Sequence, residues 1–184
     1  MNCVKLVLVS LMATVSSAQL RVSADVTGTH EVKVLGIKAD NDAGLGITIG
    51  YDHVLGGTGS IEYGAGAEYQ LNRENKVEDA DGGKFGFTSP YGFLRYALSE
   101  QLYGVARIGY ALLFSGDDTY TGDEIDLKGG LMYGVGGGFK LNDQLSVEGG
   151  YYSNAGTGEL SEEGLTLDLE VVYTRVNVGV NYTF

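Results

Sequence analysis

Alternation between apolar and polar residues is the feature of this sequence that most constrains its fold. The last residues, YTRVNVGVNYTF (173–184), place an apolar or aromatic side chain at every second position counted back from Phe184. A period of two puts neighbouring side chains on opposite faces of an extended strand. The chain therefore ends in a two-faced strand, where most chains end in a polar segment that frays.

The same period recurs along the chain and predicts eight strands, whereas the 3.6-residue period of an amphipathic helix is almost absent. The first predicted strand loses its phase at EVKVLGIK (31–38). The only proline, Pro90, falls inside the fourth, where we expect a bulge or a similar irregularity. The eight strands cover residues 20–36, 44–55, 60–71, 84–98, 101–114, 127–141, 144–153 and 168–184.

The connections between these strands alternate between short and long. The tight turns are GGTG (56–59), SE (99–100) and ND (142–143). The long polar loops are residues 72–83, 115–126 and 154–167, and the first loop, around ADNDAG (39–44), is shorter. Short turns at one end and long loops at the other are typical of outer-membrane barrels. An even number of strands also places both chain ends on the short-turn side.

The N-terminal residues 1–18 have the features of a signal peptide. The apolar run LVLVSLMATV (6–15) precedes the small residues Ser16, Ser17 and Ala18. We expect cleavage after Ala18, which leaves a barrel domain of residues 19–184. The alternative is an uncleaved anchor, but this run is shorter than the roughly 20 residues that a spanning helix needs.

Charge and composition exclude several classes of protein. The net charge of −12 argues against a nucleic-acid partner, because phosphate binding needs a basic surface. Cys3 is the only cysteine, so a disulfide within the chain is impossible. The 30 glycines follow no Gly-X-Y repeat, which excludes collagen.

Glycine on the polar faces indicates which face points outwards. A soluble lipocalin-like barrel and a membrane barrel share this strand pattern with inverted faces. Glycine weakens an exposed strand, but the narrow lumen of an eight-stranded barrel needs small residues. The polar faces carry Gly64, Gly66, Gly134, Gly136 and Gly138. We therefore place the apolar faces in lipid and the polar faces in the lumen. The charged residues that this places in the lumen are Asp52, Glu62, Glu68, Arg95, Arg107, Glu148 and Arg175.

Aromatic residues lie near both ends of the apolar faces, with aliphatic residues between them. On the short-turn side they are Tyr96, Phe139, Tyr182 and Phe184, and towards the long loops they are Tyr69, Tyr110, Phe114, Tyr133 and Tyr151. Two aromatic girdles match the two interfaces of a membrane with water. The alternative explanation is the general preference of Tyr and Phe for strands.

The C-terminus resembles the signal that the bacterial β-barrel assembly machinery reads, a terminal aromatic preceded by apolar residues at alternate positions. Phe184, Tyr182 and Val180 match that pattern. Residues 19–184 as a whole resemble the small OmpA/OmpX-type outer-membrane β-barrel families. The resemblance implies a stand-alone, eight-stranded antiparallel up-and-down transmembrane β-barrel in a bacterial outer membrane. A spanning sheet must also close, because lipid offers no partners for backbone N–H and C=O groups.

Charged residues in such a lumen should form ion pairs, because unpaired buried charges are costly. The network would be a polar plug that closes the barrel, and the alternative is a conducting or gated pore. Eight strands leave no room for an aqueous channel, which favours the plug.

The long loops are acidic, and their carboxylates could bind Ca²⁺ or Mg²⁺ and bridge to lipopolysaccharide. No defined calcium-loop spacing is present, so solvated acidic loops are the simpler interpretation. The acidic residues are Asp79, Asp81, Asp117, Asp118, Asp123, Glu124, Asp126, Glu159, Glu162 and Glu163.

A lipid-modifying enzyme would need a histidine next to a serine and an acid. Neither of the only two histidines, His30 and His53, has a neighbouring serine in a recognisable arrangement, although distant strands could supply one. Transport of small hydrophobic molecules through an opening in the wall is a further alternative. Pro90 and the glycines at 134 and 136–138 would be the weak points of that wall.

We therefore predict an integral outer-membrane β-barrel protein with a non-catalytic role in envelope structure or surface interaction through its acidic extracellular loops. The alternatives are transport of small hydrophobic molecules, porin-like passage, and lipid modification. The expected partners are outer-membrane lipid, lipopolysaccharide and the assembly machinery, the last through Tyr182 and Phe184. We expect a monomer, and we assign no catalytic, cofactor-binding or metal-binding residue and no cofactor.

Overall fold

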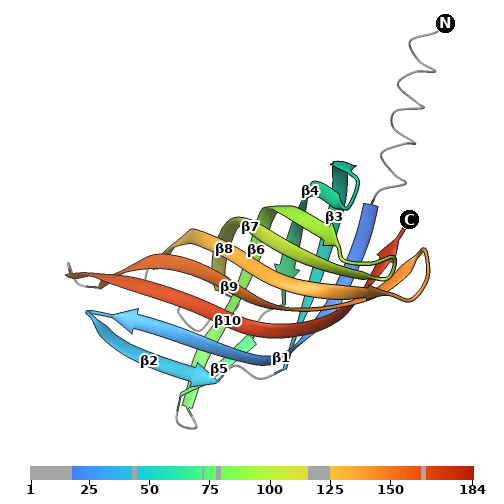
Figure 1. The fold of residues 1–184 in the computed structure, drawn as a ribbon. Coiled ribbons are helices and arrows are strands. Elements are labelled where there is room, and N and C mark those ends of the chain that lie inside the picture. Colours follow the sequence, from blue (N-terminus) through green and yellow to red (C-terminus); the bar gives the residue numbers. More distant parts are fainter. Residues whose placement is uncertain (1–17, 43–44, 72, 78–79, 116–124, 163–164) are drawn as a thin grey trace, which may run out of the picture.

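The fold is a closed antiparallel β-barrel (Figure 1), seen in a computed structural model that describes residues 18–42, 45–71, 73–77, 80–115, 125–162 and 165–184. The strands are β1 (Ala18–Val34), β2 (Ile37–Asp42), β3 (Gly46–Thr58), β4 (Ile61–Gln70), β5 (Arg73–Val77), β6 (Ala80–Ala97), β7 (Leu102–Ser115), β8 (Ile125–Lys140), β9 (Leu145–Glu162) and β10 (Leu165–Thr183). No helix among the described residues has the length and apolar character needed to cross a membrane. The predicted signal peptide lies outside the described residues except for Ala18, the first residue of β1.

Ten strands occupy eight positions around the barrel, because two positions are each filled by a pair of strands. β2 and β3 lie end to end along β1, which pairs Thr29 with Asp42 and Ser23 with Thr48. β5 and β4 lie end to end along β6 in the same way. β1 also pairs with β10 and closes the sheet. The predicted eight-stranded up-and-down barrel is confirmed.

The end of the chain is part of the sheet. β10 pairs with β9 on one side and with β1 on the other. The N–H of Phe184 donates to the carbonyl of Ala18 at 3.1 Å, and the Phe184 ring meets Tyr182 edge to face at 5.2 Å between centroids. The start of β1 and the C-terminus therefore lie together on the short-turn side (Figure 1). Recognition of this end by an assembly machinery stays a prediction.

The tight turns at this end are built as the sequence indicates. Gly59 has a φ of 59°, in the left-handed region that favours glycine. The hydroxyl of Ser99 accepts from the N–H groups of Gln101 and Leu102. Asn142 does the same with its side-chain oxygen for Gln144 and Leu145. Such side-chain acceptors stabilise short turns.

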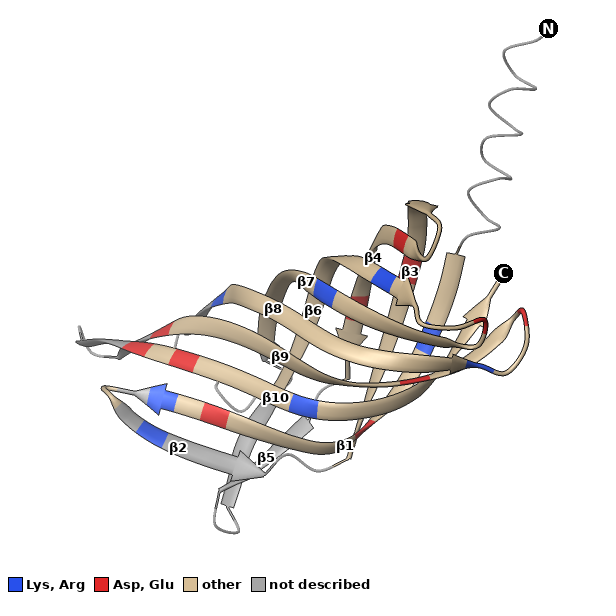
Figure 2. Cartoon of the chain, in the orientation of Figure 1, with Lys and Arg blue, Asp and Glu red and all other residues tan. Residues whose placement is uncertain are grey.

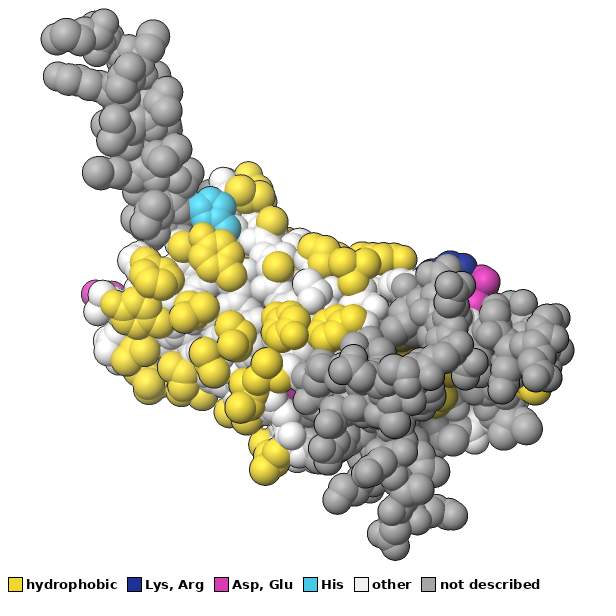
Figure 3. All heavy atoms as spheres, turned by 180° about the vertical axis from the view of Figure 1, so that it is seen from behind, with side chains coloured by type: hydrophobic (Ala, Val, Ile, Leu, Met, Phe, Trp, Pro, Cys, Tyr) yellow, Lys and Arg dark blue, Asp and Glu magenta, His cyan; other side chains and the backbone are white. Residues whose placement is uncertain are grey.

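The apolar faces point outwards and the polar faces point inwards, as predicted. Ile108, Val135 and Val178 are 64%, 59% and 47% exposed, whereas Glu68 and Arg107 are 2% and 3% exposed. Apolar side chains cover much of the described outer surface (Figure 3). The predicted girdle residues are all exposed except Phe114, which is half-buried and stacks on Tyr69 at 5.5 Å. A surface of this kind is suited to lipid.

The first predicted strand differs from the structure because β1 contains a bulge. One extra residue, Val26, lies between the paired residues Asp25 and Thr27. Arg21 and Asp25 face the lumen before the bulge, and His30 faces it afterwards, so the inward residues change from odd to even numbers. This change blurs the pattern at 31–38. The predicted loop at 39–44 is also wrong, because the chain turns at Leu35 and Gly36 and residues 37–42 form β2.

Other predicted boundaries also change at the long-loop end. Much of the predicted loop 154–167 belongs to β9 and β10. The outer faces there are polar, so no lipid-facing alternation marks the strands. At Pro90 the predicted irregularity is local: the ladder between β6 and β7 omits the rows of Ser89 and Pro90 but keeps its register.

The barrel wall divides at the long-loop end. Among the described residues no ladder joins β2 to β5, and the ladder between β7 and β8 ends at Ala111 and Gly130. The strands beyond these points form two extensions that diverge (Figure 1). We call the parts of β8, β9, β10, β1 and β2 beyond these points the larger extension. The corresponding parts of β5, β6 and β7 are the smaller extension.

Inside the barrel, tyrosine rings lie on glycines of the neighbouring strand. A Cβ atom at Gly134 would lie 2.3 Å from Cδ1 of Tyr152, and one at Gly138 would lie 2.2 Å from Cζ of Tyr103. Such distances are far below van der Waals contact. The glycines of β8 therefore make room for aromatic side chains in the narrow lumen.

We predict that Gly134→Ala destabilises the barrel, because the new methyl group would displace the ring of Tyr152. Overpacking of this kind costs about 1–3 kcal/mol. Gly104→Ala is the matched control, since a Cβ there would lie 3.9 Å from the carbonyl oxygen of Gly136. Urea unfolding of both variants in lipid vesicles checks this. Equal midpoints for the two variants would show that the ring does not need the glycine.

Candidate functional site

The centre of the lumen contains a continuous row of charges of alternating sign. Arg107 pairs with Asp52 at 2.9 Å and with Glu148 at 2.6 Å. Arg21 pairs with Glu148 at 3.3 Å and with Glu68 at 2.8 Å. Each carboxylate thus joins the arginines of different strands.

The row continues at both ends. Arg175 pairs with Glu68 and, through Nε, with Asp25 at 3.5 Å. At the opposite end Arg95 lies 3.8 Å from Asp52. We call these eight residues the charge chain, and in order they are Arg95, Asp52, Arg107, Glu148, Arg21, Glu68, Arg175 and Asp25.

The charge chain is neutral and buried. Its four arginines and four carboxylates are each at most 4% exposed. They come from every position of the barrel except β8, which contributes the glycines (Figure 2 shows the charges on the strands). Removing charges from water is costly, and alternation gives every member at least one partner of opposite sign. The chain therefore ties the strands together across the lumen.

Tyrosine side chains add hydrogen bonds and ring contacts to the charge chain. The hydroxyl of Tyr91 donates to Asp52 at 2.6 Å, and Arg107 donates to the hydroxyl of Tyr152 at 2.6 Å. The guanidinium of Arg107 also lies 5.7 Å and 5.8 Å from the centroids of these two rings. Contacts between a cation and an aromatic face add to the pairing when both are desolvated.

The predicted lumen charges are confirmed, with one difference. Arg95, Arg107, Arg175, Asp52, Glu68 and Glu148 belong to the charge chain. Glu62 instead lies at the short-turn mouth, where its side chain is 46% exposed and accepts from Arg95 at 3.1 Å. The prediction did not include Arg21 and Asp25, although both occupy polar positions of the first alternating segment.

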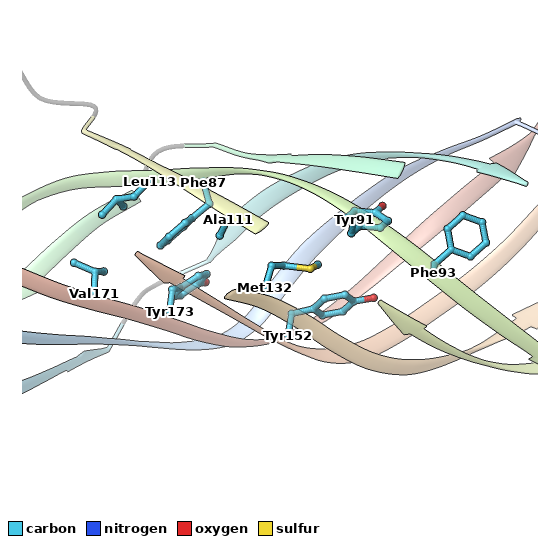
Figure 4. Close-up of a cluster of buried hydrophobic side chains, with 9 residues drawn as sticks. All are labelled: Phe87, Tyr91, Phe93, Ala111, Leu113, Met132, Tyr152, Val171 and Tyr173. Atoms are coloured by element: carbon cyan, nitrogen blue, oxygen red, sulfur yellow. The ribbon is translucent and has the colours of Figure 1, made fainter. Parts of the chain in front are cut away.

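A cluster of apolar side chains lies above the charge chain, towards the long loops, and the sequence reasoning did not predict it. Phe87 and Leu113 of the smaller extension face Val171 and Tyr173 of the larger one (Figure 4). The rings of Phe87 and Tyr173 are nearly parallel at 6.3 Å between centroids. Met132 lies between this layer and Tyr152, whose hydroxyl accepts from Arg107 (Figure 4). The lumen is thus polar in the middle and apolar at the long-loop end.

The two histidines lie at opposite ends of the barrel. His30 is buried in the apolar layer, with its ring stacked on Tyr173 at 4.3 Å. His53 is half-buried near the short turns, where it pairs with Ala18 and Ala65. They therefore do not form one site, and the expectation of a non-catalytic protein stays a prediction.

The third feature of the lumen is a cavity of about 210 Å³ at the short-turn mouth. Its lining residues include Arg95, Tyr103 and Ser146 at the inner end and Glu62 and Lys140 at the rim. It is open to solvent at the rim, where residues 142–144 are exposed.

Most of the predicted acidic loop residues lie outside the described residues or have only their backbone described. Glu159 is the exception, and it pairs with Lys128 at 2.6 Å. Within the described part of the chain no group of three potential ligands is placed to hold a metal ion. The glycines of β8 form no opening, because Gly134 and Gly136 pair with β7 and with β9.

No family model matches this sequence, and no match was found among curated proteins. Solved structures do match. Neisserial surface protein A (NspA) superposes with a TM-score of 0.57 at 12% identity, over 92% of this chain and 98% of that one. For outer membrane protein OprG from Pseudomonas aeruginosa the TM-score is 0.51 at 11% identity, over 92% and 97%. For outer membrane protein AlkL it is 0.50 at 13%, over 92% and 91%.

These similarities show the fold, which is that of the small outer-membrane β-barrels, consistent with the predicted OmpA/OmpX-type architecture. The apolar exterior agrees with that fold. Together they indicate an integral protein of the bacterial outer membrane, as predicted.

We predict that Glu148→Gln destabilises the barrel by about 3–5 kcal/mol, because it breaks a buried ion pair and leaves the chain with an excess positive charge. Glu148 accepts from Arg21 and Arg107 and also from Tyr103. Glu170→Gln is the control, since Glu170 pairs with Lys33 at 2.9 Å on the exposed surface. Exposed pairs contribute about 0–1 kcal/mol. Unfolding free energies measured in lipid vesicles compare the two. A loss at Glu148 no larger than at Glu170 would contradict the role of the charge chain.

Proposed function

Starting from the fold of a small outer-membrane β-barrel, we propose a non-catalytic role in the cell envelope, in which a closed barrel holds its projecting strands at the cell surface. The observation that carries this proposal is the charge chain. A neutral, fully paired row of charges across the lumen stabilises the barrel and leaves no continuous path for water. The barrel then serves as a membrane anchor for the two extensions.

The outer faces of the strands in the two extensions support this role. They carry ion pairs at half-exposed positions, which are Lys33 with Glu170, Lys38 with Glu31, and Lys128 with Glu159. Like charges lie directly opposite one another in two rows, Lys33 with Lys38 and Glu159 with Asp168. The ion pairs relieve part of this repulsion. A charged outer face of this kind suits water and the polar headgroups of lipopolysaccharide, and it does not suit lipid chains.

We predict no steady conductance when the purified barrel is reconstituted in a planar bilayer, because the charge chain closes the lumen. Folding is checked first by comparing the gel mobility of unheated and boiled protein, since a folded barrel and its unfolded chain migrate differently. A steady, ion-selective current from the folded form would contradict the plug and support porin-like passage.

Passage of small apolar molecules is the second candidate, and the apolar layer above the charge chain favours it. A molecule that entered between the two extensions would meet Phe87, Leu113 and Val171. It could leave sideways where no ladder joins β2 to β5, and so reach the headgroup region of the membrane without crossing the charges. This route needs no aqueous channel.

For this second candidate we predict that expression of the barrel raises the uptake of radiolabelled n-octane by cells, and that Leu113→Asp abolishes the increase. The introduced carboxylate would make the apolar layer polar. Leu35→Asp is the control, because Leu35 lies at the turn between β1 and β2 and is 72% exposed. Uptake that is equal with and without the barrel would exclude this candidate and leave the anchoring role.

A further inference from the structure

The cavity at the short-turn mouth has the features of a binding site. Its volume is about 210 Å³, enough for a small molecule. Its inner end is formed by buried polar side chains, since Arg95, Tyr103 and Ser146 are 4%, 3% and 7% exposed. Its rim is formed by exposed residues of the turn between β8 and β9. The site is thus open at one end and prearranged at the other.

Arg95 is the charged group at the inner end of the cavity. It donates through Nη1 to Glu62 at 3.1 Å and through Nη2 to the side-chain oxygen of Gln19 at 2.7 Å. Its Nε is buried and has no hydrogen-bond partner among the described residues. The other arginines of the charge chain also have an Nε without a hydrogen-bond partner among these residues, so the feature that distinguishes Arg95 is its exposed partner Glu62.

Glu62 shows which chemical group Arg95 binds on the side of the cavity. Its carboxylate reaches inwards from the rim and is the nearest acidic partner of Arg95, since Asp52 lies farther away at 3.8 Å. Glu62 is also 46% exposed, so its pairing with Arg95 competes with water and contributes little. A carboxylate from a ligand could therefore take its place on Nη1, and by also displacing the side-chain oxygen of Gln19 from Nη2 it could form the two parallel hydrogen bonds that a guanidinium favours.

The rest of the lining suits a ligand that also carries hydroxyl groups. Lys140 at the rim supplies a second cation, which offsets the negative charge of the rim residue Asp143. Gln19, Ser146 and Thr183 supply amide and hydroxyl groups, which can both donate and accept. Tyr103 adds an aromatic ring at the inner end.

We propose that this mouth binds a small hydroxylated carboxylate, such as an acidic sugar, whose carboxylate replaces Glu62 on Arg95. Glu62 then acts as an internal competitor that holds the empty site closed. In a barrel oriented as outer-membrane barrels are, the mouth faces the periplasm. The proposal goes beyond the anchoring role and does not depend on what the projecting strands contact.

Titration calorimetry of the folded barrel in detergent micelles tests this with a matched pair of probes. N-acetylmuramic acid and N-acetylglucosamine differ only in the lactyl group that carries the carboxylate. We expect heat from the first and none from the second. Glu62→Gln should tighten binding several-fold because it removes the competitor, and Lys140→Gln should weaken it. Arg95→Gln should weaken it by about tenfold or more, the effect of losing a charge-assisted hydrogen bond.

Glu159→Gln is the matched control for Glu62→Gln. Its carboxylate is 44% exposed and pairs with Lys128, but it lies at the opposite end of the barrel, so binding should not change. Binding by the Glu62→Gln variant alone would also support the proposal, since it would show that the competitor dominates. The proposal is overturned if N-acetylglucosamine binds equally well, if Glu62→Gln leaves binding unchanged or weakens it, or if neither the wild type nor this variant releases heat at millimolar probe. These readouts do not require Arg95→Gln to fold.

Discussion

The rest of the structure depends on the requirement that charges inside a narrow barrel be paired. The apolar exterior leaves the lumen as the place for ionised groups, and a charge there without a partner would be strongly destabilising. The charge chain satisfies this requirement from Arg95 to Asp25, with an opposite charge beside every member. Because its members come from seven of the eight positions around the barrel, the charges can all be paired only when the sheet is closed.

The chain also divides the lumen into two compartments with different chemistry. Towards the long loops the interior is apolar, with Phe87 and Tyr173 stacked across it. Towards the short turns it is polar and partly empty, with Arg95 at the boundary. A polar ligand could occupy the compartment near the short turns, and an apolar molecule could occupy the one near the long loops. Neither would need to cross the other compartment. A single continuous pore is the arrangement that this division disfavours.

The sequence predicted the part of the structure that lies in lipid and little of the structure outside it. Where strands face lipid on one side, as at Ile108 or Val178, the alternation is strict and the strands, faces and lumen charges follow from it. Beyond the lipid the outer face is polar, so strands such as the upper part of β9 appear as loops in the sequence. The apolar layer was missed because Leu113 and Val171 are ordinary strand residues whose inward direction depends on phase. The mouth depends on contacts between distant residues, such as Glu62 with Arg95, which a local pattern does not contain.

The bulge at Val26 has a consequence for how the chain tolerates change. By taking up one extra residue, it shifts the inward positions from odd numbers, as at Asp25, to even numbers, as at His30. Removal of Val26 would restore a regular ladder, in which Asp25 and Thr27 keep their partners Asn177 and Val176 and His30 keeps its inward direction. A one-residue insertion or deletion elsewhere in β1 would instead turn the residues on one side of the change to the opposite face, unless a further bulge took it up.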